Sequence, residues 1–98
     1  MKHYVKMYPT PQGMMLASCD EDILGKSYSQ GDLRLDVKES FYGGDIMDSQ
    51  GLANSLNSAS IANLVGEHTV AVAIDIGLID ESCIMNIQNT PHAQFVRC

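Results

Sequence analysis

Three short stretches of the chain carry side chains that could bind a ligand or move a proton. Residues 41–44 read Phe-Tyr-Gly-Gly, residues 66–67 read Gly-Glu, and residues 91–94 read Pro-His-Ala-Gln. Adjacent glycines let a backbone turn sharply or approach a ligand closely. A helix that opens directly after a strand presents N–H groups that attract anions, although the Glu67 carboxylate would repel one. Each stretch therefore has a ligand-binding interpretation and an ordinary structural one.

Acid–base chemistry would depend on Glu67 and His92. A carboxylate and an imidazole can divide the base and acid roles only if the fold brings them within hydrogen-bond reach. A lone histidine is more often a hydrogen-bonding residue of the surface or core, and no spacing in the sequence names a partner for His92. An enzyme or small-ligand binder would use a pocket near Phe41, Tyr42, Asn63, Glu67 and His92.

The cysteines are odd in number and widely separated, at Cys19, Cys83 and Cys98. Cysteine and histidine are common metal ligands, so these cysteines and His92 could in principle form a metal site. No C-x-x-C or H-x-x-x-H spacing supports such a site. Scattered cysteines are typical of free thiols in a reducing cytoplasm. The start of the chain carries charge where a signal peptide is apolar, and no apolar run approaches the ~20 residues of a membrane span. We therefore expect a cytoplasmic protein with no metal, no cofactor and no membrane contact.

Charge is unevenly distributed along the chain, whose formal net charge is −6. Residues 1–38 hold five cations and five carboxylates, whereas residues 39–98 hold one cation and seven carboxylates. An acidic chain disfavours non-specific nucleic-acid binding, because that attraction comes from neutralising phosphates. One N-terminal face nevertheless alternates cations with rings, as platforms for single-stranded RNA do. This candidate RNA face, which a solvated strand would also produce, comprises Lys2, Tyr4, Lys6 and Tyr8.

The elements that must position these groups are organised around one strand–helix–strand unit. Residues 60–65 are typical of a strand, after which the apolar period changes from two to about 3.6 and predicts a helix over 67–77. Gly66 can serve as the N-cap of this helix and Gly77 as its stop. Residues 84–87 are again apolar, which predicts a right-handed crossover between two parallel strands.

The N-terminal half predicts further strands. Residues 2–8 alternate between two faces, and residues 14–19 return after a Pro/Gly turn, which indicates a β-hairpin. Asp20 is placed to cap a short helical turn over 21–24. Residues 33–37 alternate as another strand with one solvated face.

Asp48 is a good N-cap for a short helix over 49–56, with Met47 and Leu52 spaced for a hydrophobic staple. The predicted fold is a single α+β domain over residues 1–98. Its mixed sheet has about five strands, with the principal helix packed on one face and the short helix nearby. No pattern decides the conformation of the last ten residues.

The principal helix is apolar on nearly all sides. Val72 and Ile76 lie four residues apart on the face opposite Val70 and Ile74. Such a helix is covered either by the rest of its own chain or by another chain. The sequence therefore predicts a protein partner or a homodimer contact through Val72 and Ile76, and a site could also form between subunits.

In their order and spacing, the residues 41–44, the stretch Ala62-Asn-Leu-Val-Gly-Glu67 and the residues 91–94 resemble a family of small archaeal proteins known as domain of unknown function 424. The resemblance covers nearly the whole chain, including residues 19–21 and the strand at 33–37. It brings no activity with it, and it implies a cytoplasmic protein associated with translation. The residues that it marks as functional surface are Phe41, Tyr42, Gly43, Gly44, Asn63, Gly66, Glu67, His92 and Gln94.

The leading hypothesis is a small non-enzymatic binding or adaptor protein, serving the translation apparatus through protein or RNA contacts. The alternative is a small enzyme or ligand binder with the pocket described above, and a third is an obligate homodimer. Geometry separates them. A concave pocket in which Glu67 and His92 converge favours chemistry or ligand binding, whereas a flat surface with dispersed motifs favours an adaptor.

Overall fold

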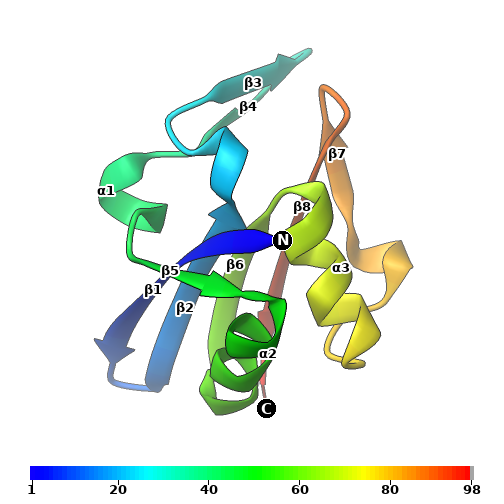
Figure 1. Ribbon diagram of the computed structural model, residues 1–98. Helices are drawn as coiled ribbons and strands as arrows, with labels where there is room; N and C mark the ends of the chain where they lie inside the picture. Colours follow the sequence, from blue (N-terminus) through cyan, green and yellow to red (C-terminus); the bar gives the residue numbers. More distant parts are fainter. Residues whose placement is uncertain (98) are drawn as a thin grey trace.

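The computed structural model describes residues 1–97 and contains a six-stranded mixed sheet, with the two longer helices on one face and a short helix and a hairpin on the other (Figure 1). In spatial order the sheet strands are β5 (Asp45–Asp48), β1 (Lys2–Thr10), β2 (Gly13–Asp20), β6 (Ile61–Val65), β8 (Thr90–Val96) and β7 (Met85–Ile87). The separate hairpin is β3 (Ser27–Gln30) and β4 (Leu33–Asp36). The helices are α1 (Glu39–Tyr42), α2 (Ser49–Ser58) and α3 (Glu67–Asp75), with 3-10 turns η1 (Glu21–Ile23) and η2 (Glu81–Cys83).

The α+β class, the β1–β2 hairpin and the strand at β4 confirm the expectations from sequence. The strand count is larger than expected, because β3, β5 and β8 were not recognised. β3 reads Ser-Tyr-Ser-Gln, which has no apolar alternation that would indicate a strand. The strand is accordingly mostly exposed. The last ten residues, whose conformation no sequence pattern decided, contain β8 (Thr90–Val96), and Cys98 lies outside the described residues.

Helix α2 begins as the sequence predicts. Oδ1 of Asp48 accepts a hydrogen bond from the backbone N–H of Gly51 at 2.8 Å. Met47 and Leu52 both pack in the same hydrophobic cluster, as a staple requires. The helix extends to Ser58, two residues beyond the prediction.

The expected parallel pairing of residues 60–65 with 84–87 is wrong. β8 lies between β6 and β7 and pairs antiparallel with both, and the parallel neighbour of β6 is β2. The reason is a two-residue turn in which Gln88 and Asn89 have φ values of +52° and +64°. Two successive positive φ values suit the twist of a tight hairpin, so the chain folds back after β7 instead of continuing away.

Helix α3 ends two residues earlier than predicted, at Asp75, and Gly77 stops it. The N–H of Gly77 donates to Ile74 O at 2.9 Å and the N–H of Leu78 to Ala73 O at 3.0 Å. Gly77 has φ +78°, which places it in the left-handed conformation that this helix stop requires.

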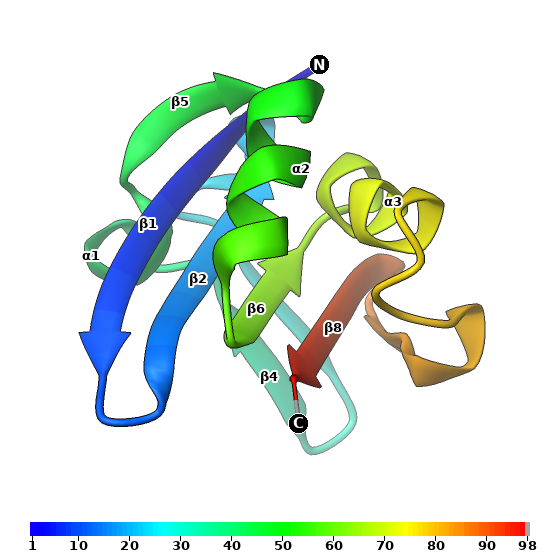
Figure 2. The same ribbon diagram turned by 90° about the horizontal axis from the view of Figure 1, so that it is seen from below.

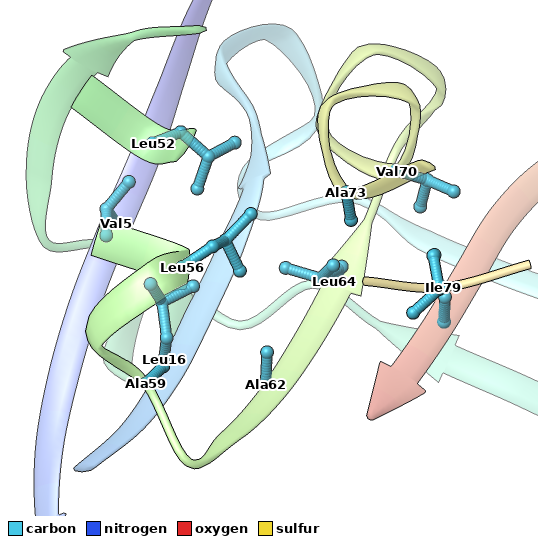
Figure 3. Packing of buried hydrophobic residues seen from close by; sticks show 11 residues of the cluster. Val5, Leu16, Leu52, Leu56, Ala59, Ala62, Leu64, Val70, Ala73 and Ile79 are labelled. Atoms are coloured by element: carbon cyan, nitrogen blue, oxygen red, sulfur yellow. The ribbon is translucent and has the colours of Figure 1, made fainter. Parts of the chain in front are cut away.

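Two hydrophobic clusters lie on opposite faces of the sheet. On one face, α2 packs against β1 and β2, while α3 packs against β2, β6 and β8 (Figure 2). Figure 3 shows side chains from the two helices meeting those of the strands, and the labelled residues include Leu16, Leu52, Leu56, Leu64, Val70 and Ala73. On the other face, α1 and the β3–β4 hairpin cover Ala17, Cys19 and Val65 with the side chains of Leu35, Val37 and Tyr42.

Between residues 1 and 97, no helix combines the length and apolar character that crossing a membrane requires.

Candidate binding surface along strand β8

Strand register places Asn63, His92 and Gln94 on one face of the sheet. Asn63 of β6 lies opposite Gln94 of β8, and Val65 lies opposite His92. Directly opposed residues of paired strands project to the same side. That side faces away from α2 and α3, because Val65 belongs to the cluster beneath α1 and the hairpin.

Three cross-strand rows run over this face from β2 to β8. One row is Met15, Ile61 and Val96; the next is Ala17, Asn63 and Gln94; the third is Cys19, Val65 and His92, extended by Met85 of β7. Burial decreases toward β8, where Gln94 and Val96 are exposed, and Met85 of β7 is exposed as well. We call the β8 end of these rows, together with the adjoining residue of β7, the open sheet face. It comprises Met85, His92, Gln94 and Val96.

Tyr42 joins α1 to the middle row. Its phenol donates to Oδ1 of Asn63 at 2.6 Å. The Phe41 ring packs edge-on against Tyr42, with 4.9 Å between centroids, and stacks on Tyr8 at 5.5 Å. Burial raises the pKa of the Tyr42 phenol, so it remains a neutral donor at physiological pH. The aromatic pair therefore fixes α1 on the sheet, with both rings occupied by contacts within the chain.

The glycine pair after α1 has a structural role. The N–H of Gly43 donates to Glu39 O at 2.8 Å and ends the helix. A Cβ on Gly44 would overlap the carbonyl group of Val5. Gly44 thus lets the chain approach β1 closely as it enters β5.

His92 presents one ring nitrogen to the surface. Its Nδ1 lies 3.0 Å from Leu64 O, and because a carbonyl only accepts, Nδ1 carries the proton. Burial lowers the pKa of His92, which keeps the imidazole neutral with a lone pair on Nε2. The ring lines a hollow of about 290 Å³ together with Cys83, Met85 and Gln94. Within residues 1–97, no three His, Cys, Asp or Glu side chains gather closely enough to hold a metal ion.

Gly66 and Glu67 lie elsewhere, at the start of α3. The N–H groups of His68 and Thr69 donate to the Asp20 carboxylate at 3.1 Å and 2.7 Å. Asp20 was expected to cap the turn at 21–24, but its side chain caps α3 instead. An anion at this helix start would have to displace Asp20. Glu67 lines a hollow of about 150 Å³ there, which is separate from the hollow lined by His92.

The part of the candidate RNA face formed by Lys6 and Tyr8 lies under α1. The Lys6 ammonium donates to Ser40 O at 2.9 Å, and the Tyr8 phenol donates to Phe41 O at 2.6 Å. Tyr4 packs against the second hydrophobic cluster, and Lys2 is exposed. Stacking of bases on this face stays a prediction, and it would require α1 to move from the Tyr8 ring.

The predicted contact through Val72 and Ile76 is only partly available. Val72 is half-buried against the first hydrophobic cluster, whereas Ile76 remains exposed. A homodimer through this face stays a prediction.

Within residues 1–97, part of the outer edge of β8 has no pairing strand. β7 pairs only with Thr90, Pro91 and His92. Pro91 O accepts from Gly66 N–H, and Arg97 N–H donates to Ser60 O, so odd-numbered residues of β8 point their backbone groups toward β6. Backbone direction alternates along a strand, so Gln94 and Val96 point their N–H and C=O groups to the unpaired side.

A large hollow lies directly beside this unpaired edge. Its volume is about 810 Å³, and it is bounded by β8 and by the chain that leaves α3. We call it the β8 groove. Ile74, Leu78, Ile79 and Phe95 supply its apolar lining, and Asp80 and Glu81 supply two carboxylates.

The family's sequence model, described as "Protein of unknown function (DUF424)", matches residues 8–98. The chain belongs to the DUF424 family. This confirms the resemblance drawn from the three motifs. Among solved structures, an uncharacterized conserved protein from Methanopyrus kandleri is similar, with 25% identity and a TM-score of 0.81. The match covers 100% of this chain and 95% of that one. No curated protein matched the chain.

In this DUF424 protein, the motif residues Tyr42, Asn63, His92 and Gln94 converge on one face, while Glu67 does not. Sequence reasoning missed Met85, Val96 and the two groove carboxylates. The alternation of β8 was a usable signal, but the turn before it contains no glycine and so hid the hairpin.

Proposed function

We propose that this DUF424 protein is a non-enzymatic binding protein that engages a partner protein along β8. The observation that carries the proposal is the unpaired edge at Gln94 and Val96, bordered by the β8 groove. Unpaired strand edges are templates for association, and proteins commonly shorten, charge or cover them. An edge left open beside a hollow with both apolar and acidic lining is therefore suited to a partner.

Apolar exposure supports the same surface. Val96 is 68% exposed and Met85 49% exposed, and both belong to the open sheet face. Exposed apolar side chains on a face that borders unpaired backbone groups favour a protein contact. The adaptor role in translation and the cytoplasmic location that the sequence predicts belong to this proposal.

A protein partner suits the geometry better than RNA. The Tyr8 ring stacks on Phe41 of α1, Tyr4 packs against the second hydrophobic cluster, and the carboxylates of the β8 groove would repel phosphates. The alternative of an enzyme receives less support, because Glu67 and His92 line separate hollows. Tyr42 and Asn63, also assigned to that pocket, bond to each other.

Affinity capture from native cell extract tests the proposal. The wild-type protein and the variants Met85→Asp and Val96→Asp serve as baits, with the captured proteins quantified by mass spectrometry. We expect a defined partner that the wild type retains and both variants lose, because a buried aspartate lacks a partner at an apolar contact.

Leu33→Asp and Ile46→Asp are matched controls. Leu33 is 46% exposed on the hairpin, and Ile46 is 51% exposed on the opposite edge strand, β5. Each adds the same charge to an exposed apolar position away from β8. Partners lost equally from all four variants, or retained by all four, would contradict the proposal.

A further inference from the structure

We propose that the unpaired edge of β8 accepts an extended cationic segment of another protein as an additional β-strand. This inference rests on the proposed function and specifies its mode of binding and the chemistry of the partner. It assigns the backbone groups of Gln94 and Val96 as the recognition ladder and the β8 groove as the side-chain site.

The ladder follows from the register. Gln94 and Val96 each offer one N–H and one C=O on the side away from β6, and β7 has already ended opposite His92. Strand residues rise about 3.3 Å each, so a segment of four or five residues spans this edge and continues beyond it. A strand added here contributes main-chain hydrogen bonds, while pockets beside it select alternate side chains.

Strand β5, the edge strand at the far end of the sheet, is less suited to such a partner. β5 is four residues long and carries Asp45 and Asp48 at its ends. Short, charged edge strands are the usual protection against edge-to-edge pairing. The far end of the β7–β8 hairpin is held instead by β3, because the N–H of Gln88 donates to Oε1 of Gln30 at 2.8 Å.

The groove determines what the added strand carries. Phe95 and Ala93 project toward α3, whereas Gln94 and Val96 project to the open sheet face. Apolar side chains of the added strand would contact Phe95, Ile74 and Leu78 on the α3 side. Asp80 and Glu81 line the same hollow, so they favour lysine or arginine in the segment.

Charge also selects among the occupants. Pairing β8 with β8 of a second copy would bring Asp80 and Glu81 of both copies toward one interface, between chains of net charge −6. Like charges across an interface disfavour it. A cationic segment from another protein meets no such repulsion. It is therefore the occupant that suits both the unpaired edge and the β8 groove.

The test uses the full chain and two synthetic eight-residue peptides, acetyl-(Val-Lys)4-amide and its acidic counterpart acetyl-(Val-Glu)4-amide. Binding is followed by amide chemical shifts in NMR. We expect the basic peptide alone to bind, with the amide signals of Gln94 and Val96 shifting and those of Ile46 and Met47 on β5 unchanged. Neutralising the groove with Asp80→Asn and Glu81→Gln should weaken binding and reduce its salt dependence.

Gln94→Pro and Gln94→Ala form a matched pair. Proline removes the N–H at the unpaired edge without touching the ladder to β6, and proline is tolerated on edge strands. Loss of that donor should weaken the basic peptide about tenfold. Alanine keeps the N–H and should bind as the wild type does. If Gln94→Pro fails to fold, the inference is judged on the Asp80→Asn/Glu81→Gln variant, which should bind the basic peptide more weakly than the wild type does.

Equal binding of the two peptides, equal binding by the Gln94→Pro and Gln94→Ala variants, or no binding of either peptide would overturn the inference. The outcome is separable from that of the proposed function. A captured partner that Val96→Asp loses, together with failure of the basic peptide, leaves the binding function standing and removes the strand-addition mode. Binding of the basic peptide at Gln94 and Val96 with no captured partner supports the strand-addition mode and removes the support that capture would give to the proposed function.

Discussion

Asp20, at the end of β2, caps helix α3 from 49 residues away: its Oδ1 accepts the backbone N–H of Thr69 at 2.7 Å. Oδ2 of the same carboxylate accepts from His68 at 3.1 Å. Two of the N–H groups that a helix start leaves without an intrahelical partner are thereby satisfied by a neighbouring strand. The contact ties α3 to the centre of the sheet, and so fixes the position of the groove at the other end of that helix.

Replacing Asp20 should loosen this attachment. Asp20→Ala leaves two N–H groups without their acceptor, one of them buried, and should lower the free energy of unfolding by about 1–3 kcal/mol. Asp20→Asn keeps one acceptor oxygen and should cost less. Urea unfolding measures both, with Asp22→Ala, at an exposed neighbouring position, as the control. An equal effect of Asp20→Ala and Asp22→Ala would show that the cap contributes little.

Gly66 should tolerate no side chain. It has φ +110°, and a Cβ there would overlap the Asp20 carboxylate. Because the backbone conformation alone costs ~1–3 kcal/mol for other residues, Gly66→Ala should destabilise the fold by about 2 kcal/mol or more. Gly25→Ala is the control, since Gly25 has φ +87° but open space around it. Thermal unfolding that ranks Gly25→Ala as the more damaging change would argue against the overlap with Asp20.

Stability should fall in mild acid because of His3. The imidazole is buried, with Nδ1 2.8 Å from Thr69 Oγ1 and Nε2 2.9 Å from Ser49 Oγ. Burial lowers the pKa of His3 from its ordinary 6.5, an effect that the charge of Asp20 partly opposes. Below pH 6.5 the unfolded chain binds protons that the folded protein does not, so the free energy of unfolding decreases.

Urea unfolding at about pH 7 and about pH 5 measures this loss. His3→Gln should be less stable at neutral pH and less sensitive to acid than the wild type. His92 has the same sign, because burial lowers its pKa too, and it accounts for part of the slope that remains. A wild-type slope unchanged by His3→Gln would remove His3 as its cause.

The bond between Tyr42 and Asn63 should couple α1 to the sheet. Tyr42→Phe leaves Oδ1 of Asn63 without its donor and should cost about 0.5–1.5 kcal/mol. A double-mutant cycle with Asn63→Ala isolates the pair, because residues in one hydrogen bond give non-additive effects. Strictly additive losses would mean that the bond contributes no free energy of its own.

Local signals predicted the local structure. Asp48 lies three residues before Gly51, whose backbone N–H donates to its carboxylate, so the start of α2 was predictable from the sequence. The partner of Asp20 is 49 residues away, and no spacing rule connects two such positions. Gln88 and Asn89 form a tight turn without glycine, so the antiparallel return of β8 was not expected and the wrong strand was paired with β6.

The candidate surface could be predicted only in part, because local sequence signals do not show which distant residues meet. His92 and Gln94 were selected through the family motif, and Tyr42 and Asn63 hydrogen-bond to each other, while binding by these residues stays a prediction. Their common face depends on strand register, which requires the sheet order. Val96 and the unpaired edge could be recognised only after β7 was seen to end opposite His92.

The most direct test of partner binding along β8 is amide hydrogen exchange on the complex captured from native extract, compared with the free protein. We predict slower exchange at Gln94 and Val96 in the complex, with the β5 amides Asp45–Asp48 unchanged. Protection confined to β5 or to the exposed residues of α3, with Gln94 and Val96 exchanging as fast as in the free protein, would contradict the account.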